Sequence, residues 1–157
     1  MTAAPDGVGL LRAMLRIRRL EERCIELYSA GEIRGVYRKT HLWDTENSVF
    51  DRSDDLPVVV DTEHGRIGVL VCYDVEFPEW VRAVALDGAD LLCAPVNWPL
   101  LPRPDGERPT EMVRVLAGAG MNRMPIAVCD RVGVERGQDW IGGSVITDAD
   151  GYPAALG

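Results

Sequence analysis

Cys72 lies between two expected elements, a strand and a helix, and is a candidate nucleophile. It directly follows the apolar run Arg66–Val71, which has the composition of a strand, and a helix is expected to begin at Pro78. A thiol on a sharp turn between strand and helix is held out of the sheet, where it can attack a substrate. Such a turn also lets the backbone N–H of Tyr73 point at a developing oxyanion. On spacing alone, a buried structural cysteine is an equal alternative.

Lys39 is a basic residue that can assist such a thiol. It lies between Tyr37 and Trp43 in the stretch VYRKTHLW, so we expect it to be partly desolvated. An ammonium group there would favour the thiolate and stabilise negative charge on a tetrahedral intermediate. The alternative is an ordinary surface lysine. His41 suggests a Cys–His pair, but a single histidine beside an aromatic residue is more often structural, and we interpret it so.

Short apolar segments alternate with amphipathic segments along most of the chain. This alternation is typical of an α/β domain, in which helices cover a sheet. The proline-rich stretch WPLLPRPDGERP predicts a loop, and Thr110 is a candidate cap for the helix that follows it. We predict strands at 57–62, 66–71, 91–96, 126–129 and 144–147, helices at 78–86 and 110–121, and a turn at 148–151.

The composition argues against several classes of protein. At 157 residues the chain suits one domain, and its net charge of −8 argues against nucleic-acid binding, which requires basic patches. No apolar run is long enough to cross a bilayer, and the N-terminus has no signal-peptide pattern. The four cysteines are scattered without a CxxC pair, which predicts thiols in the cytoplasm and argues against a zinc site.

The N-terminal segment is built differently from the rest. Between Leu10 and Tyr28, apolar residues recur at helical spacing, and arginine and glutamate fill much of the remainder. This pattern predicts an amphipathic helix that ends at Gly31 or Gly35. A helix of this kind normally packs its apolar face against another element.

From residue 35 to residue 157 the motifs resemble those of the nitrilase, or carbon–nitrogen hydrolase, superfamily. They are YRKTHLWDTEN, LVCYDVEFPEW, APVNWP, DRVGVERG and GGSVITDADG, in the order and approximate spacing of that family. The YDVEFPE that follows the cysteine is similar to the amidase and carbamoylase branches, whereas the nitrile-cleaving branch usually has Trp-Glu there. The resemblance implies a partial α-β-β-α sandwich over 35–157.

The resemblance also implies a Glu–Lys–Cys site that cleaves small amide or N-carbamoyl substrates through a thioester. Cys72 matches the nucleophile, Lys39 matches the lysine that steadies the oxyanion, and Glu46 approximately matches a second glutamate that positions the lysine and the substrate. No metal or organic cofactor is implied, because the cysteine and a carboxylate carry out the whole hydrolysis. The implied substrate-binding residues are Tyr73, through its backbone N–H, Glu76, Asn97 and Trp98.

The chain departs from the family pattern in its N-terminal portion. The family's general-base glutamate lies well upstream of its lysine, and residues 1–34 contain no strand followed by a proline–glutamate motif. Residues 10–34 instead resemble the first helix of the E1 alpha subunit of thiamine-diphosphate-dependent 2-oxo acid dehydrogenases. We therefore predict a chimera, in which a helical segment of different origin, 1–34, precedes a truncated hydrolase domain, 35–157.

The expected helix 110–121 departs from the pattern as well. Met121 stands where the family commonly has glutamate, and Gly118 and Gly120 each weaken a helix by up to about 1 kcal/mol relative to alanine.

Three functions are compatible with these patterns. The first is a thiol amidohydrolase, slowed roughly 10²–10⁴-fold by the missing base, with nitrile hydrolysis as a weaker variant. The second is a non-catalytic, self-associating partial domain, and we expect a homo-oligomer. The third, favoured only by residues 10–34, is a dehydrogenase fragment, and the lack of a cofactor-binding motif argues against it.

Overall fold

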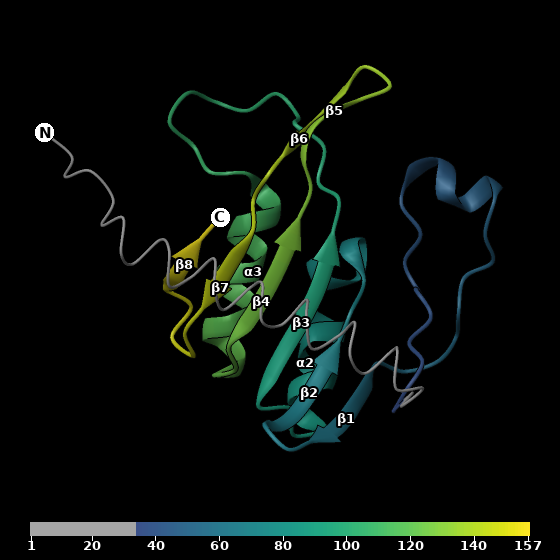
Figure 1. The fold of residues 1–157 in the computed structure, drawn as a ribbon, viewed down its shortest axis with the longest axis vertical. Helices are drawn as coiled ribbons and strands as arrows, with labels where there is room; N and C mark the ends of the chain where they lie inside the picture. The colour runs from purple at the N-terminus through teal and green to yellow at the C-terminus, as the bar shows by residue number, and fades with distance from the viewer. Residues whose placement is uncertain (1–33) are drawn as a thin grey trace, which may run out of the picture.

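The computed structural model of the protein describes residues 34–157. These residues form a six-stranded sheet, a two-stranded hairpin and two α-helices, so the predicted α/β class is confirmed (Figure 1). The amphipathic helix predicted between Leu10 and Tyr28 lies outside the described residues, as does the predicted N-terminal segment apart from Arg34. No helix within 34–157 is long and apolar enough to span a bilayer.

The strands of the larger sheet combine parallel and antiparallel pairing. Its order is β1 (Val58–Thr62), β2 (Gly65–Val69), β3 (Leu91–Val96), β4 (Ile126–Asp130), β7 (Val145–Thr147) and β8 (Pro153–Leu156). The central strands β2, β3 and β4 run parallel, whereas β1 at one edge and the pair β7 and β8 at the other are antiparallel to their neighbours. The separate antiparallel hairpin consists of β5 (Val132–Glu135) and β6 (Gln138–Ile141).

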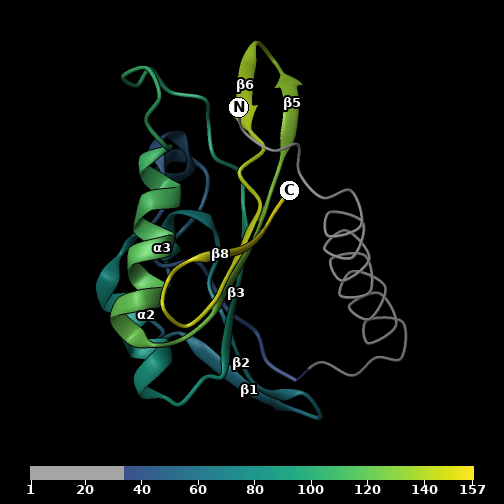
Figure 2. The same cartoon turned by 90° about the vertical axis from the view of Figure 1, so that its left-hand side faces the viewer.

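Both α-helices, α2 (Pro78–Leu86) and α3 (Thr110–Asn122), cover the same face of the sheet (Figure 2). Alternate residues of each strand face this layer because successive side chains point to opposite sides of a pleated sheet. Gly68 of β2 lets α2 approach closely, since a Cβ there would overlap the side chain of Val84. The resulting core contains Leu70, Val75, Val81, Val84, Leu92, Ala94, Val96, Trp98, Val115, Ala119, Met124, Ile126, Val128 and Val145.

The helices and strands predicted between residues 57 and 151 are present, with small shifts at their ends. The helix expected over 110–121 extends to Asn122, and the strand expected to reach Val71 ends at Val69. The prediction that Thr110 caps its helix is wrong, because Pro109 occupies the N-cap position and Thr110 is already helical. The sequence patterns did not predict the hairpin, β8, or the 3₁₀ helices η1 (Asp44–Ser48) and η2 (Cys72–Glu76).

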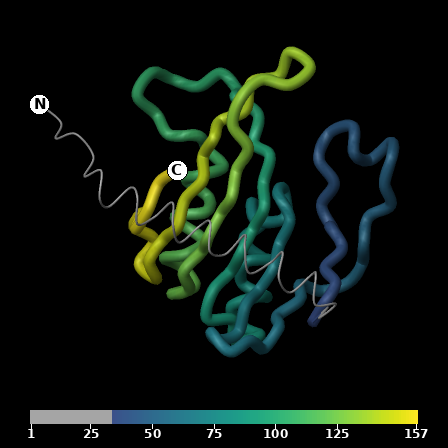
Figure 3. The backbone as a smooth tube through the Cα atoms, viewed as in Figure 1, coloured from purple at the N-terminus to yellow at the C-terminus, as the bar shows by residue number. Residues whose placement is uncertain are grey.

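The carboxyl ends of β2, β3 and β4 lie together at the end of the sheet that is uppermost in Figure 1. η2 follows β2, the loop 97–109 follows β3, and the hairpin follows β4. The segment 34–57, which contains η1, passes beside the β1 edge and reaches the same end (Figure 3). Ligands of open α/β sheets bind beyond the carboxyl ends of the strands, so these segments are where a site is expected.

Candidate active site

Cys72 begins η2 at the carboxyl end of β2, on the sharp turn between strand and helix that its sequence context predicts. Its backbone φ of +50° lies in the left-handed region. A residue that carries a Cβ pays roughly 1 kcal/mol or more for this conformation, which persists only where the surrounding structure imposes it. The turn brings Cys72 out of the line of the strand and into the wall of a cavity.

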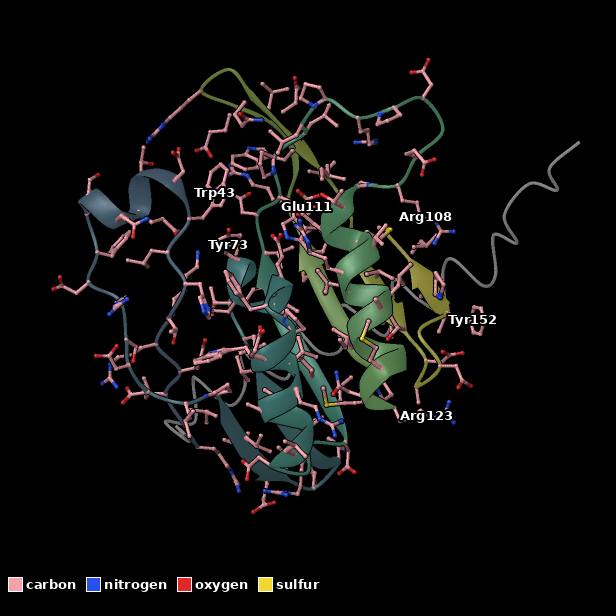
Figure 4. The ribbon with its side chains drawn as sticks, turned by 180° about the vertical axis from the view of Figure 1, so that it is seen from behind. Trp43, Tyr73, Arg108, Glu111, Arg123 and Tyr152 are labelled. Carbon is pink, nitrogen blue, oxygen red and sulfur yellow. The ribbon has the colours of Figure 1, made fainter. Side chains whose placement is uncertain are left out.

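The cavity beside Cys72 has a volume of about 220 Å³. Figure 4 shows Trp43, Tyr73 and Glu111 gathered at this end of the molecule, near the start of α3. Among residues 34–157, no group of three or more His, Cys, Asp or Glu side chains is placed to hold a metal ion. The lining residues are Trp43, Cys72, Tyr73, Glu76, Asn97, Trp98, Pro99, Leu101, Thr110, Glu111 and Arg114.

Lys39 and Glu46 form an ion pair next to this cavity but do not line it. The Lys39 Nζ donates a hydrogen bond of 2.5 Å to the Glu46 Oε2, and only 13% of the Lys39 side chain is exposed. The backbone N–H of Trp43 donates to the same carboxylate oxygen at 2.7 Å, which anchors Glu46 in the first turn of η1. Burial opposes ionisation of Glu46, but these hydrogen bonds outweigh it and lower the pKa of the carboxyl.

The pKa of the Cys72 thiol is raised above its ordinary value, because burial is the largest influence on it. The backbone N–H of Asn97 donates a hydrogen bond to the sulfur and lowers the pKa, as does the positive charge of Lys39. The negative charges of Glu46 and Glu76 raise it. Lys39 thus acts on the thiol in the predicted direction, but its charge does not make Cys72 a thiolate near neutral pH, since burial and the carboxylates prevail.

Asp74 joins the segment that carries Lys39 to the turn that carries Cys72. Its side chain is completely buried and accepts a hydrogen bond of 2.6 Å from the hydroxyl of Tyr37. It also accepts hydrogen bonds from the backbone N–H groups of Thr40, at 3.3 Å, and His41, at 2.7 Å. These contacts bracket Lys39 on both sides and hold its backbone against η2.

His41 is also held by Asp74 and makes no pair with Cys72. Its Nδ1 lies 2.7 Å from the Asp74 Oδ1, and its ring stacks on that of Phe77 with a centroid distance of 3.6 Å. The edge of the ring meets Trp80 at 5.0 Å. The interpretation of His41 as a structural residue therefore agrees with its surroundings, and the Cys–His alternative has no geometric support.

Asp130 fixes the backbone of Trp98, a residue that lines the cavity. One of its carboxylate oxygens accepts a hydrogen bond from the N–H of Trp98 at 3.0 Å, and the other accepts one from Gly143 at 2.7 Å. These bonds tie the segment after β3 to the start of β7 and position Asn97, whose N–H contacts the Cys72 sulfur.

The first turns of α3 supply two charged side chains that the sequence motifs did not indicate. Glu111 and Arg114 both line the cavity, and Arg114 forms an ion pair with Glu76 from η2. Burial raises the pKa of Glu76, and this outweighs the opposite effect of Arg114. The available signal was their spacing of three residues on an expected helix, which places two side chains on one face.

Comparison with known proteins identifies the family of the chain. The family model described as carbon–nitrogen hydrolase matches residues 18–156. A probable nitrilase of Schizosaccharomyces pombe is 38% identical over 128 residues, which cover 82% of this chain and 45% of the relative. The N-carbamoylputrescine amidase of Solanum tuberosum is 37% identical over 119 residues, which cover 72% of this chain and 40% of the relative. The chain thus spans less than half the length of these two curated relatives.

Solved structures show the same fold. A variant of the amidase from Nesterenkonia sp. AN1 superposes with a TM-score of 0.67 at 31% identity, over 77% of this chain and 46% of that one. The structure of that variant shows covalent addition of the acetamide moiety of fluoroacetamide at the active-site cysteine. The resemblance of residues 10–34 to an E1 alpha subunit is not shown by these comparisons.

Proposed function

The chain belongs to the carbon–nitrogen hydrolase family, and from this premise we propose that it cleaves a non-peptide carbon–nitrogen bond through a thioester on Cys72. The substrates proposed are small amides or N-carbamoyl compounds. The observation that carries the proposal is the placement of Cys72, which lies on a strained turn in the wall of a small cavity and within the electrostatic influence of Lys39.

The first half of the proposed reaction is acylation of Cys72. Its thiolate attacks the carbonyl carbon, a C–S bond forms, and the carbonyl π electrons move to oxygen. The Lys39 ammonium and the backbone N–H of Tyr73 stabilise the resulting oxyanion. When the oxyanion collapses, the C–N bond breaks. The leaving nitrogen takes from water the proton that the thiol released on forming the thiolate, and departs as ammonia or an amine.

The second half is hydrolysis of the thioester. Water adds to the carbonyl carbon and gives up a proton, a second oxyanion forms at the same place, and its collapse breaks the C–S bond. The acid or carbamic acid leaves, and the Cys72 sulfur takes up a proton, which regenerates the thiol. Glu46 keeps Lys39 in position through both halves, because its carboxylate accepts the hydrogen bond from the Lys39 Nζ.

In this proposal, no residue of the described range 34–157 serves as general base. Loss of general acid–base assistance typically lowers a rate about 10²–10⁴-fold. Glu76 does not take this role in the proposal, since its carboxylate is engaged by Arg114.

The test is to trap the acyl-enzyme. The full chain is mixed with a panel of simple amides and N-carbamoyl amines, quenched in acid and digested, and the peptide that contains Cys72 is weighed. We expect an acyl adduct on Cys72 and release of ammonia or amine, both of which Cys72→Ala abolishes. Cys129→Ala, which removes an exposed thiol of β4, serves as the matched control and should keep both. Ammonia release that survives Cys72→Ala would refute the proposal.

The second candidate is a non-catalytic partial domain that self-associates. Two observations favour it: the raised pKa of the Cys72 thiol, and the exposure of large apolar side chains in the segment 34–57, where Phe50 and Leu56 are 63% and 72% exposed. It predicts no adduct in the trapping experiment and an oligomer in size-exclusion chromatography with light scattering. The double substitution Phe50→Asp and Leu56→Asp should then lower the measured mass, whereas a monomer at high protein concentration would exclude self-association.

A further inference from the structure

We propose that Glu111 makes the cavity selective for amides or N-carbamoyl compounds that carry a cationic amino group away from the bond to be cleaved. This inference rests on the proposed function of Cys72 and adds a substrate class to it. It assigns a role in specificity to a residue that no motif of the sequence indicated.

Glu111 is a largely buried glutamate in the wall of the cavity. The residue is only 9% exposed and lies in the first turn of α3, and the cavity that it lines also contains Cys72. No residue of the described range 34–157 donates a hydrogen bond to its carboxylate or pairs with it. Its carboxylate oxygens keep contact with solvent through the cavity. A cation bound there would be the partner that the described residues do not supply.

The other charges around the cavity are already paired. Arg114 engages Glu76, and Lys39 engages Glu46, so each pair is close to neutral as a unit. Glu111 therefore contributes the unbalanced negative charge of the lining. This charge would repel an anionic ligand, and no unpaired cation among the described lining residues would offset the repulsion. The same charge would attract an ammonium group.

The remaining lining suits an ammonium group on a short chain. Trp43, Tyr73 and Trp98 are among the residues that line the cavity, and the faces of aromatic rings attract cations. The volume of about 220 Å³ lies below the roughly 300–1,000 Å³ of pockets for drug-sized ligands. Because Cys72 and Glu111 line the same cavity, a small aliphatic molecule can place its carbonyl at the sulfur and its amino group at the carboxylate.

The experiment measures the charge preference of Cys72 directly, so that it does not depend on turnover. Three methanethiosulfonates of similar size are used: the cationic trimethylammonioethyl, the anionic sulfonatoethyl and the neutral hydroxyethyl reagent. Each transfers its thioalkyl group to the thiolate and releases methanesulfinate. The rate at Cys72 is followed by peptide mass spectrometry at one pH and low ionic strength, and the cation-to-anion rate ratio removes the influence of the thiol pKa.

We expect a cation-to-anion ratio of at least about tenfold for the native chain, corresponding to a charge interaction of about 1.4 kcal/mol. Glu111→Gln should lower this ratio about tenfold, and Glu111→Asp, which keeps the charge, should retain most of it. Glu107→Gln is the matched control, because it removes an exposed glutamate of the preceding loop that does not line the cavity. This control should keep the native ratio within about twofold.

A second arm compares hydrolysis of 5-aminopentanamide with that of hexanamide, its neutral isostere, and Glu111→Gln should reduce the preference in kcat/KM for the former. Equal ratios in the native chain and in folded Glu111→Gln would overturn the inference. If Cys72 reacts without charge preference, this inference fails while the proposed function stands. If Cys72 reacts with none of the reagents, both fail, and circular dichroism of each variant identifies any loss of fold.

Discussion

The buried carboxylate of Asp74 accepts a hydrogen bond of 2.6 Å from the hydroxyl of Tyr37, 37 positions earlier in the chain. Asp74 stands two residues after Cys72, and Tyr37 stands two residues before Lys39. One hydrogen bond thus fixes the distance between the two segments that carry the proposed nucleophile and its cation. Burial and the bond to this carboxylate raise the pKa of Tyr37 above its ordinary value, so the phenol remains a donor across the physiological range.

Asp74→Asn should destabilise the protein and separate these segments. The amide cannot accept every hydrogen bond that the carboxylate receives, and its NH₂ group faces donors in a site without solvent. We expect the free energy of unfolding to fall by roughly 3 kcal/mol in urea denaturation. Asp55→Asn is the control, since Asp55 is exposed and pairs with Arg38 on the surface; its effect should stay within about 0.5 kcal/mol. Equal effects of the two substitutions would show that the hydrogen bonds of Asp74 do not stabilise the packing of these two segments.

Lys39→Met and Glu46→Gln should shift the pKa of the Cys72 thiol in opposite directions. The charge of Lys39 lowers this pKa, so its removal should raise the pKa and slow alkylation of Cys72 at any pH below it. The charge of Glu46 raises the pKa, so Glu46→Gln should lower it and speed alkylation. The measurement is the rate of iodoacetamide labelling of Cys72 against pH. Arg38→Met, which removes a neighbouring exposed cation, should leave the profile nearly unchanged.

Turnover by the same two variants distinguishes the effect of each charge on the Cys72 thiol from the effect of Glu46 on the position of Lys39. Both Lys39→Met and Glu46→Gln should lower kcat on the amide panel, the first by roughly 10²–10³-fold, because the oxyanion loses its cation. Glu46→Gln should lower kcat although it makes the thiol more reactive, since Lys39 loses the acceptor that holds its ammonium in place. A Glu46→Gln variant with a faster kcat would contradict the positioning role.

Cys72→Gly should be more stable than Cys72→Ala. Both remove the sulfur, but only glycine adopts a φ of +50° without a steric penalty. We expect the difference in the free energy of unfolding to be about 1 kcal/mol in favour of glycine, which reverses the usual order within regular elements. Urea denaturation of the two variants measures it. Greater stability of the alanine variant would mean that the turn is not strained at this position.

The two glycines of α3 should respond oppositely to alanine. A Cβ on Gly118 would lie 3.5 Å from the nearest atom of Val81, an ordinary contact, so Gly118→Ala should raise the free energy of unfolding by up to about 1 kcal/mol. A Cβ on Gly120 would lie 2.8 Å from the backbone oxygen of Asp150, so Gly120→Ala should lower it by about 1–3 kcal/mol. Thermal or urea denaturation of both variants gives the test, and stabilisation by Gly120→Ala would contradict this packing.

Local patterns predicted the elements that build the layers. Apolar residues at helical spacing predicted α3, and a short apolar run between turn residues predicted β3. The hairpin β5–β6 escaped prediction because all four residues of β5 are exposed, so no buried face marks it as a strand. η1 escaped because its stability depends on the contact between Glu46 and the N–H of Trp43, which no hydrophobic period signals.

The sequence by itself determined the family, the α/β class and the two segments that carry Cys72 and Lys39, because these depend on residue types at short spacing. Only the tertiary structure decided what surrounds the thiol. Burial and charge act through space, so the raised pKa of Cys72 and the entry of Glu111 into its cavity depend on the packing of α3 against η2. The same packing leaves the carboxylate of Glu111 without a partner among the described residues, and on this our substrate inference depends.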